Sequence, residues 1–145
     1  MRRAALCAAL VLVLALAGVA AGCGGEAGDL MLVRRNGSIP AARLDLRFTQ
    51  DGRVACNRAP LRQLTSAQTL AARDIQRRLA GKEGGGPATR HVDLRPGPGA
   101  ILRYRVSMDA GNVAFSDTSR RQPRAFYELA RLTREVAQSV CHQPR

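Results

Sequence analysis

The N-terminal stretch constrains this chain most, because it decides how many residues are left to fold. Two arginines at positions 2 and 3 precede an apolar run from Ala4 to Ala21, which stops at Gly22 and Cys23. A basic start, an apolar run and small residues before a break are typical of an export signal. A cysteine directly after the small residues predicts a lipoprotein signal, cut before Cys23, whose thiol carries a lipid such as palmitate.

Two other interpretations of this leader stay open. The apolar run also suits a transmembrane anchor in a thin bilayer, and an ordinary signal peptidase would accept the small residues Val19–Ala21. The lipoprotein interpretation divides the chain into a signal peptide (residues 1–22), a lipidated cysteine with a flexible tether (residues 23–28) and one small domain (residues 29–145). It places the protein at the cell membrane, lipid-anchored on the extracytoplasmic face.

The cysteines agree with export. Of the four in the sequence, Cys7 falls within the signal and Cys23 carries the lipid, which leaves Cys56 and Cys141. Disulfides persist outside the cytoplasm, so we expect these two to pair. The pair would close a loop of about 85 residues, which stabilises the fold by about 4 kcal/mol on the chain-entropy model.

The remaining residues predict a small α+β domain. Alternating or β-rich segments indicate strands at Asp29–Arg35 (ended by an Asn36-Gly37 turn), Ala42–Phe48, Arg53–Cys56, Arg90–Arg95, Ala100–Met108 and Asn112–Asp117. Helices are expected over Leu64–Ala80, where Thr65 and Gln68 fit a capping box, and from about Pro123 to Cys141. We therefore expect an antiparallel sheet of about four to six strands with two amphipathic helices on one face and one disulfide.

Each helix has a predicted buried stripe. The first comprises Ala67, Leu70, Ala71, Ile75 and Leu79, and the second comprises Phe126, Leu129, Leu132, Val136 and Val140.

The chain is strongly basic. It has 23 basic and 11 acidic residues, a formal net charge of +12, and loss of residues 1–22 removes two arginines and no acid. Alternation along the strands places Arg43, Arg47, Arg53, Arg103 and Arg105 on the sheet face away from the helices. Such a face suits anionic envelope polymers, or it is an ordinary solvated surface that reflects a GC-rich genome. The scattered arginines and few aromatics argue against nucleic acid as a partner.

Catalytic and metal-binding patterns are weak. The two histidines are His91 and His142, and no serine lies in a nucleophile-elbow pattern. Catalysis by Cys141 and His142 would need a free thiolate, which the expected disulfide consumes. None of the cysteines or histidines has the close spacing of zinc ligands. We therefore predict no enzyme activity, no metal and no cofactor.

Four segments carry a resemblance to known proteins. They are Val33–Pro40, Leu102–Val106, Val113–Ser119 and the terminal helix up to Cys141. Over most of residues 30–141 the chain resembles a group of small, uncharacterised actinobacterial lipoproteins, which carries no established activity.

The order of elements is also similar to that of emfourin-type inhibitors of thermolysin-like metallopeptidases. These open with a strand and an Arg-x-Gly turn, here Arg35-Asn36-Gly37, and later have a Tyr-x-Val strand, here Tyr104-Arg105-Val106, before a closing helix. This chain departs from them in its predicted lipid anchor, its two cysteines and its single turn glycine. The similarity implies peptidase inhibition by an exposed loop.

The sequence favours a membrane-anchored, non-enzymatic module that binds an extracytoplasmic protein. Exposed loops on a rigid scaffold are common contact sites. The predicted contact residues are the loop Asn36, Gly37, Ser38, Ile39 and Pro40, and the arginines Arg43, Arg47, Arg53, Arg103 and Arg105. A peptidase inhibitor and a binder of anionic envelope polymers are the alternatives.

Overall fold

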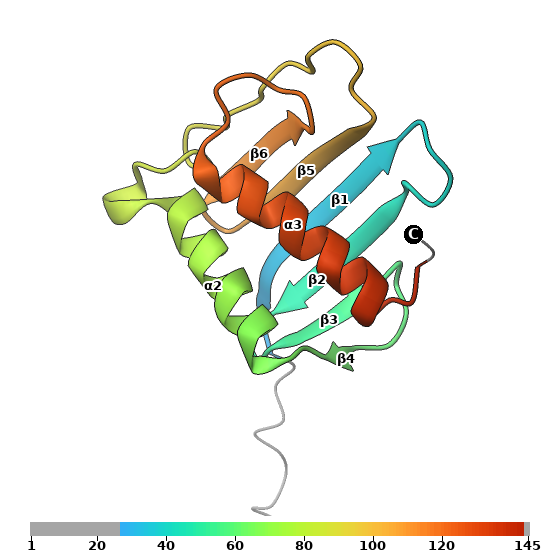
Figure 1. The fold of residues 1–145 in the computed structure, drawn as a ribbon. Helices are drawn as coiled ribbons and strands as arrows, with labels where there is room; N and C mark the ends of the chain where they lie inside the picture. The colour runs from blue at the N-terminus through green and yellow to red at the C-terminus, as the bar shows by residue number, and fades with distance from the viewer. Residues whose placement is uncertain (1–26, 144–145) are drawn as a thin grey trace, which may run out of the picture.

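A computed structural model describes residues 27–143, which form one antiparallel sheet with two helices on the same face (Figure 1). The strands are β1 (Asp29–Gly37), β2 (Leu44–Thr49), β3 (Arg53–Cys56), β4 (Arg62–Gln63), β5 (Leu102–Met108) and β6 (Gly111–Ser116). The helices are α2 (Ser66–Ala80) and α3 (Arg124–Ser139), with a short 3₁₀ turn, η1 (Lys82–Gly84). The strand order is β4-β3-β2-β1-β5-β6. The predicted α+β architecture is confirmed.

Alternation of burial is clearest in β2. In β2, Leu44, Leu46 and Phe48 are fully buried against the helices, whereas Asp45 and Arg47 between them are partly exposed. The β2–β3 hairpin closes at Gly52, whose φ of +83° favours glycine. The hairpins β2–β3 and β5–β6 lie on either side of β1, which pairs with both β2 and β5. The first strand of the domain is therefore at the centre of the sheet.

Helix α2 begins as predicted, and Ile75 and Leu79 of its predicted stripe are buried, with Ala71 partly buried, but the buried side of its first turns is different. The side chain of Thr65 accepts a hydrogen bond from the Gln68 backbone (3.2 Å), and the Gln68 side chain accepts one from the Thr65 backbone (3.1 Å), so the capping box is confirmed. The predicted stripe was wrong at Ala67, which is exposed, and at Leu70, which is 65% exposed. The residues that are buried are Gln68, Ala72, Ile75 and Leu79.

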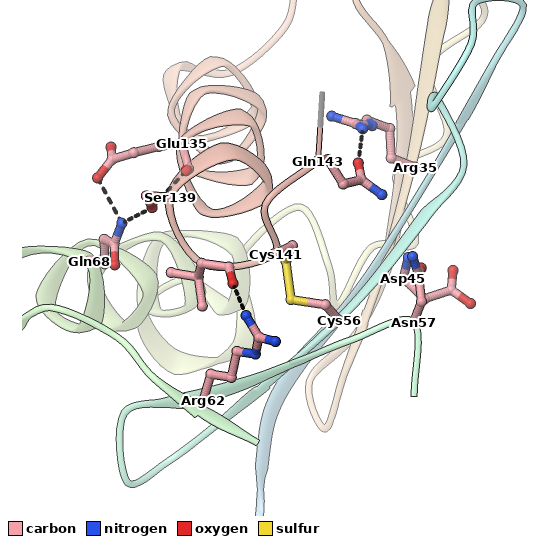
Figure 2. The surroundings of a disulfide bond; sticks show 11 residues. Arg35, Asp45, Cys56, Asn57, Arg62, Gln68, Glu135, Ser139, Cys141 and Gln143 are labelled. Carbon is pink, nitrogen blue, oxygen red and sulfur yellow. Dashed lines mark hydrogen bonds between the residues drawn. A yellow bond between two sulfur atoms is a disulfide. The ribbon is translucent and has the colours of Figure 1, made fainter. Parts of the chain in front are cut away.

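A polar contact explains this rotation of the buried face. Gln68 is only 3% exposed, and its amide donates hydrogen bonds to Glu135 (3.0 Å) and Ser139 (3.1 Å) of α3, as Figure 2 shows. A buried amide is tolerated when its hydrogen bonds are satisfied. Because the sequence pattern counted only apolar residues, it missed Gln68 and shifted the stripe.

Helix α3 follows its predicted pattern closely. Pro123 is its N-cap, and Phe126, Leu129, Leu132 and Val136 are buried, with Val140 partly buried just beyond the helix. The ring of Phe126 stacks on Phe115 of β6 (4.5 Å between centroids), which in turn stacks on Tyr104 of β5 (5.0 Å). This aromatic column packs the first turn of α3 against β5 and β6, at one edge of the sheet.

The segment between η1 and β5 differs from the prediction. Arg90–Arg95 is not a strand, and only Asp93 forms an isolated parallel bridge, with Ala114. His91, near the start of this segment, has a left-handed backbone (φ 51°), and Pro96 follows the segment. Only residues 92–94 therefore lie along β6, where Val92 and Leu94 exchange backbone hydrogen bonds with Ala114. The short strand β4 was not predicted, since two exposed polar residues give no strand signal.

The disulfide joins strand β3 to the C-terminal end of α3. Cys56, at the end of β3, is bonded to Cys141, just after α3, with Cα atoms 5.8 Å apart (Figure 2). Beside it, Arg62 of β4 donates a hydrogen bond to the Val140 carbonyl (2.8 Å). The predicted pairing is confirmed. The predicted signal peptide, the lipid site at Cys23 and most of the tether lie outside the described residues.

Candidate binding surface

One face of the sheet is uncovered by the helices in the described part of the chain (Figure 1). We call it the open face and define it by Leu32 and Arg34 of β1, Arg47 of β2, and Arg103 and Arg105 of β5. Register places them side by side, because Leu32 is opposite Arg47, and Arg34 is opposite Arg105. Successive side chains of a strand point to opposite faces of the sheet, so these residues alternate with those that point into the core.

Aspartates neutralise much of the charge on this surface. The guanidinium of Arg34 lies 3.2 Å from Asp45, and that of Arg103 lies 3.0 Å from Asp93. Two further pairs join Arg47 to Asp29 (3.3 Å) and Arg53 to Asp51 (2.6 Å). These pairs are solvent-exposed and each contributes no more than about 1 kcal/mol to stability. The surface is therefore mixed in charge, and not the continuous arginine surface that strand alternation alone suggested.

Two of the predicted arginines have no such partner. Within residues 27–143, Arg43, directly before β2, and Arg105, on β5, form no ion pair, and both are exposed. Arg105 stands directly opposite Arg34, whose own carboxylate partner is on the far side, on β2. Like charges directly opposite each other destabilise a strand pair. Among the arginines that define the open face, Arg105 is therefore the one without a carboxylate partner within residues 27–143.

The open face is hollowed on both sides of β1. A hollow of about 360 Å³ is lined by Leu32, Arg34, His91, Val92, Asp93, Arg105, Val106, Ser107, Asn112, Val113 and Ala114. A second, of about 370 Å³, shares Leu32 and Arg34 and extends over β2 to Arg47, Ala55 and Arg58. The two hollows thus lie on either side of β1 and share Leu32 and Arg34 as lining residues.

His91 is a residue of this surface that the sequence did not predict as a contact residue. Its Nδ1 lies 2.8 Å from the side-chain oxygen of Asn112 on β6, so the ring is fixed at the wall of the first hollow. The sequence placed His91 in a predicted strand. In the structure His91 lies in a turn, where its backbone N–H donates to the Ala88 carbonyl (3.0 Å) and its φ is 51°. The strand pattern does not indicate this turn.

The predicted loop Asn36–Pro40 is only partly a loop. Asn36 and Gly37 belong to β1 and pair with Arg103 and Leu102 of β5, so the predicted turn begins later, at Ser38. A side chain at position 37 would collide with the Ile101 carbonyl oxygen, which is why glycine suits this strand end.

Beyond β1 the chain turns through exposed residues. The Ser38 backbone donates to the Ile101 carbonyl (3.2 Å). Ile39 is 48% exposed and Ile101 is 46% exposed, while Pro40 is also exposed. The turn therefore presents apolar side chains to solvent at one end of the sheet.

A buried arginine holds this turn from below. Arg35 is only 8% exposed, and it donates to the Ala42 carbonyl (2.9 Å), the Ala41 carbonyl (3.0 Å) and the Gln143 side chain (3.0 Å). Burial lowers the pKa of its guanidinium from the usual value, Tyr104 acts in the opposite direction, and Arg134 lowers it further. Arg35 was missed as a site residue, although the inward alternation of Met31 and Val33 was an available signal.

Two further observations concern the described residues. Neither α2 nor α3 has the length and apolar composition of a membrane-spanning helix, within residues 27–143. In that same range, no three histidine, cysteine or acidic side chains lie close enough together to hold a metal ion.

Comparison with known protein families, with curated proteins and with solved structures finds no match to this chain. The resemblances to actinobacterial lipoproteins and to emfourin-type inhibitors therefore stay predictions.

Proposed function

We propose that this chain is a membrane-anchored extracytoplasmic lipoprotein that acts as a non-enzymatic protein-binding module, with the open face as its contact surface. The observation that carries the proposal is the pair of hollows on either side of β1, where Leu32 lies among arginines. Apolar groups surrounded by polar ones are the usual anatomy of a contact surface.

The disulfide supports the extracytoplasmic part. A bond between Cys56 and Cys141 persists in oxidising compartments, where a lipoprotein signal would deliver the chain. It also uses the thiol that a Cys141–His142 nucleophile would need, which favours a non-enzymatic role. The predicted anchor is tested by Cys23→Ala. We expect the unchanged chain to incorporate a labelled palmitate analogue and to sediment with membranes, and the variant to do neither. Equal labelling of both would contradict the lipid anchor.

A site-specific cross-link tests the contact surface. A photo-crosslinking amino acid is placed at Ser107, which is exposed and lines the first hollow, or at Gln138, which is exposed on α3. In intact cells we expect Ser107 to capture one discrete protein and Gln138 to capture none. Equal capture at both positions would contradict the proposal. Capture of anionic polymer, lost at high salt, would favour the polymer alternative instead.

The turn after β1 favours one second candidate, inhibition of a thermolysin-like metallopeptidase. Ile39 is exposed at its tip, and Arg35 holds the backbone beneath it at Ala41 and Ala42. A loop fixed in advance binds at a lower entropic cost. We expect stoichiometric inhibition of thermolysin that is lost in Ile39→Glu and kept in Arg105→Ala. No inhibition by an excess of the chain would dismiss this candidate.

A further inference from the structure

Arg105 is exposed on the open face and forms no ion pair within residues 27–143. Arg34 and Arg105 are directly opposed on neighbouring antiparallel strands. Asp45 accepts a hydrogen bond from Arg34 (3.2 Å), but no carboxylate in the described residues pairs with Arg105. This pair therefore has two guanidinium groups and one carboxylate.

The hollow beside this pair has no spare acid of its own. Asp93 is the acidic residue among those that line it, and this carboxylate accepts from Arg103 (3.0 Å). His91 and Asn112 are joined to each other on the wall (2.8 Å), and Ser107 adds a hydroxyl. The hollow thus combines an unpaired guanidinium with neighbouring polar groups, which suits an anionic guest.

The other lining residues are apolar. Leu32 and Val92 are half-buried and Ala114 is buried, and all three line the same hollow. An anion that enters it contacts hydrocarbon as well as Arg105. A carboxylate on a short aliphatic stem meets both requirements, since its methylene groups cover apolar surface while its oxygens accept hydrogen bonds from a guanidinium fork.

We propose that Arg105, assisted by Arg34, binds the carboxylate of an acidic side chain from a protein partner, inserted into the hollow between β1 and the residue 91–94 segment. The inference rests on the proposed function and names the recognition chemistry. A long polyanion would need a row of unpaired cations. Arg34, Arg47 and Arg103 on this face already engage aspartates, so one discrete carboxylate fits better.

A peptide titration tests the proposal. The probe is a short synthetic peptide that alternates glutamate with leucine, and its control has glutamine in place of each glutamate. The full chain, disulfide intact in a non-ionic detergent, is titrated by ¹H–¹⁵N NMR. We expect shifts at Leu32, Ser107 and Asn112 with the glutamate peptide, and none with the glutamine peptide. Equal binding of both peptides, or no binding of the glutamate peptide, would overturn the proposal.

Matched variants assign the interaction to Arg105. A charge-assisted hydrogen bond contributes enough that Arg105→Ala is expected to weaken binding about tenfold. Arg105→Lys keeps the charge but loses the forked guanidinium, so its affinity is expected to lie between that of the unchanged chain and that of Arg105→Ala. Arg131→Ala removes an exposed arginine on α3, the opposite side of the molecule, and should bind as the unchanged chain does. Unchanged affinity in Arg105→Ala would overturn the proposal.

Two further arms separate failure of this inference from failure of the proposed function. The Ser107 cross-link is repeated in the Arg105→Ala chain. Capture as efficient as in the unchanged chain would overturn the carboxylate site while the sheet-face function stands. No capture even in the unchanged chain would contradict that function. Polyphosphate replaces the peptide in the second arm. Shifts at the hollow with polyphosphate alone would overturn the acidic side chain in favour of a polymer.

Discussion

Arg35 and Gln143 are 108 positions apart in sequence, yet the guanidinium of one donates a 3.0 Å hydrogen bond to the side-chain oxygen of the other (Figure 2). The same guanidinium holds two backbone carbonyls of the turn after β1. The first strand, the exposed turn and the C-terminal tail are therefore connected through one buried side chain.

Replacement of Arg35 is expected to loosen this connection. Arg35→Met keeps much of the apolar stem but leaves the Ala41 and Ala42 carbonyls and the Gln143 side chain without their donor. Hydrogen bonds to a charged group predict a loss of about 2–3 kcal/mol in the free energy of unfolding, measured by urea denaturation. Arg34→Met, which breaks an exposed ion pair, should cost less than about 1 kcal/mol. Equal losses would show that Arg35 has no special role.

The disulfide is expected to supply a large share of the stability. Cys56 and Cys141 are separated by 85 positions, so reduction frees a long loop in the unfolded chain. The double change Cys56→Ala and Cys141→Ala should lower the free energy of unfolding by about 2–4 kcal/mol. Reductant should destabilise the unchanged chain similarly and leave the double variant unaffected. An effect of reductant on the double variant would implicate other thiols.

The buried face of α2 can be tested with one substitution type at two positions. Leu70→Gln changes an exposed residue and should alter the free energy of unfolding by no more than about 0.5 kcal/mol. Ala72→Gln forces a larger polar side chain into a buried position and should cost at least about 2 kcal/mol. The reverse order in urea denaturation would restore the stripe predicted from the sequence.

Alkaline pH is expected to weaken the fold through Tyr104. Burial raises the pKa of its phenol above the ordinary value of 10.0, although the nearby Arg35 and Arg134 oppose this. Below that ordinary value both states keep the proton and stability is fully present. As pH rises further, the unfolded chain ionises first, so stability falls until the folded phenol ionises too.

The measurement compares the midpoint of thermal unfolding near pH 8 and above about pH 10. The unchanged chain should lose more between these conditions than Tyr104→Phe, which cannot ionise and keeps the stacked ring against Phe115. The same alkaline loss in both proteins would assign the effect to other groups.

The candidate surface was only partly predictable. Alternation correctly put Arg47, Arg103 and Arg105 on the side away from the core, because a strand turns successive side chains to opposite faces. It did not predict which of them are neutralised. The partner of Arg103, for example, is Asp93, which comes from a segment outside the regular strands.

Local order in the sequence determined much of this protein. Alternation in β2 and β5, the Thr65–Gln68 capping box and the apolar stripe of α3 each depend on residues only a few positions apart. Their patterns can therefore be recognised in the sequence without knowledge of the fold. The parity of the cysteines likewise predicted the Cys56–Cys141 bond.

Only the tertiary structure decided the rest, because the deciding partners are distant in the chain. Gln68 is buried because Glu135 and Ser139 receive its hydrogen bonds, and that contact turns α2 away from its predicted face. Arg105 stands out because strand pairing brings Arg34 opposite it without a second carboxylate. Residue types and periodicity indicate the faces of the strands and of α3, whereas register and packing decide the buried face of α2 and which side chains meet.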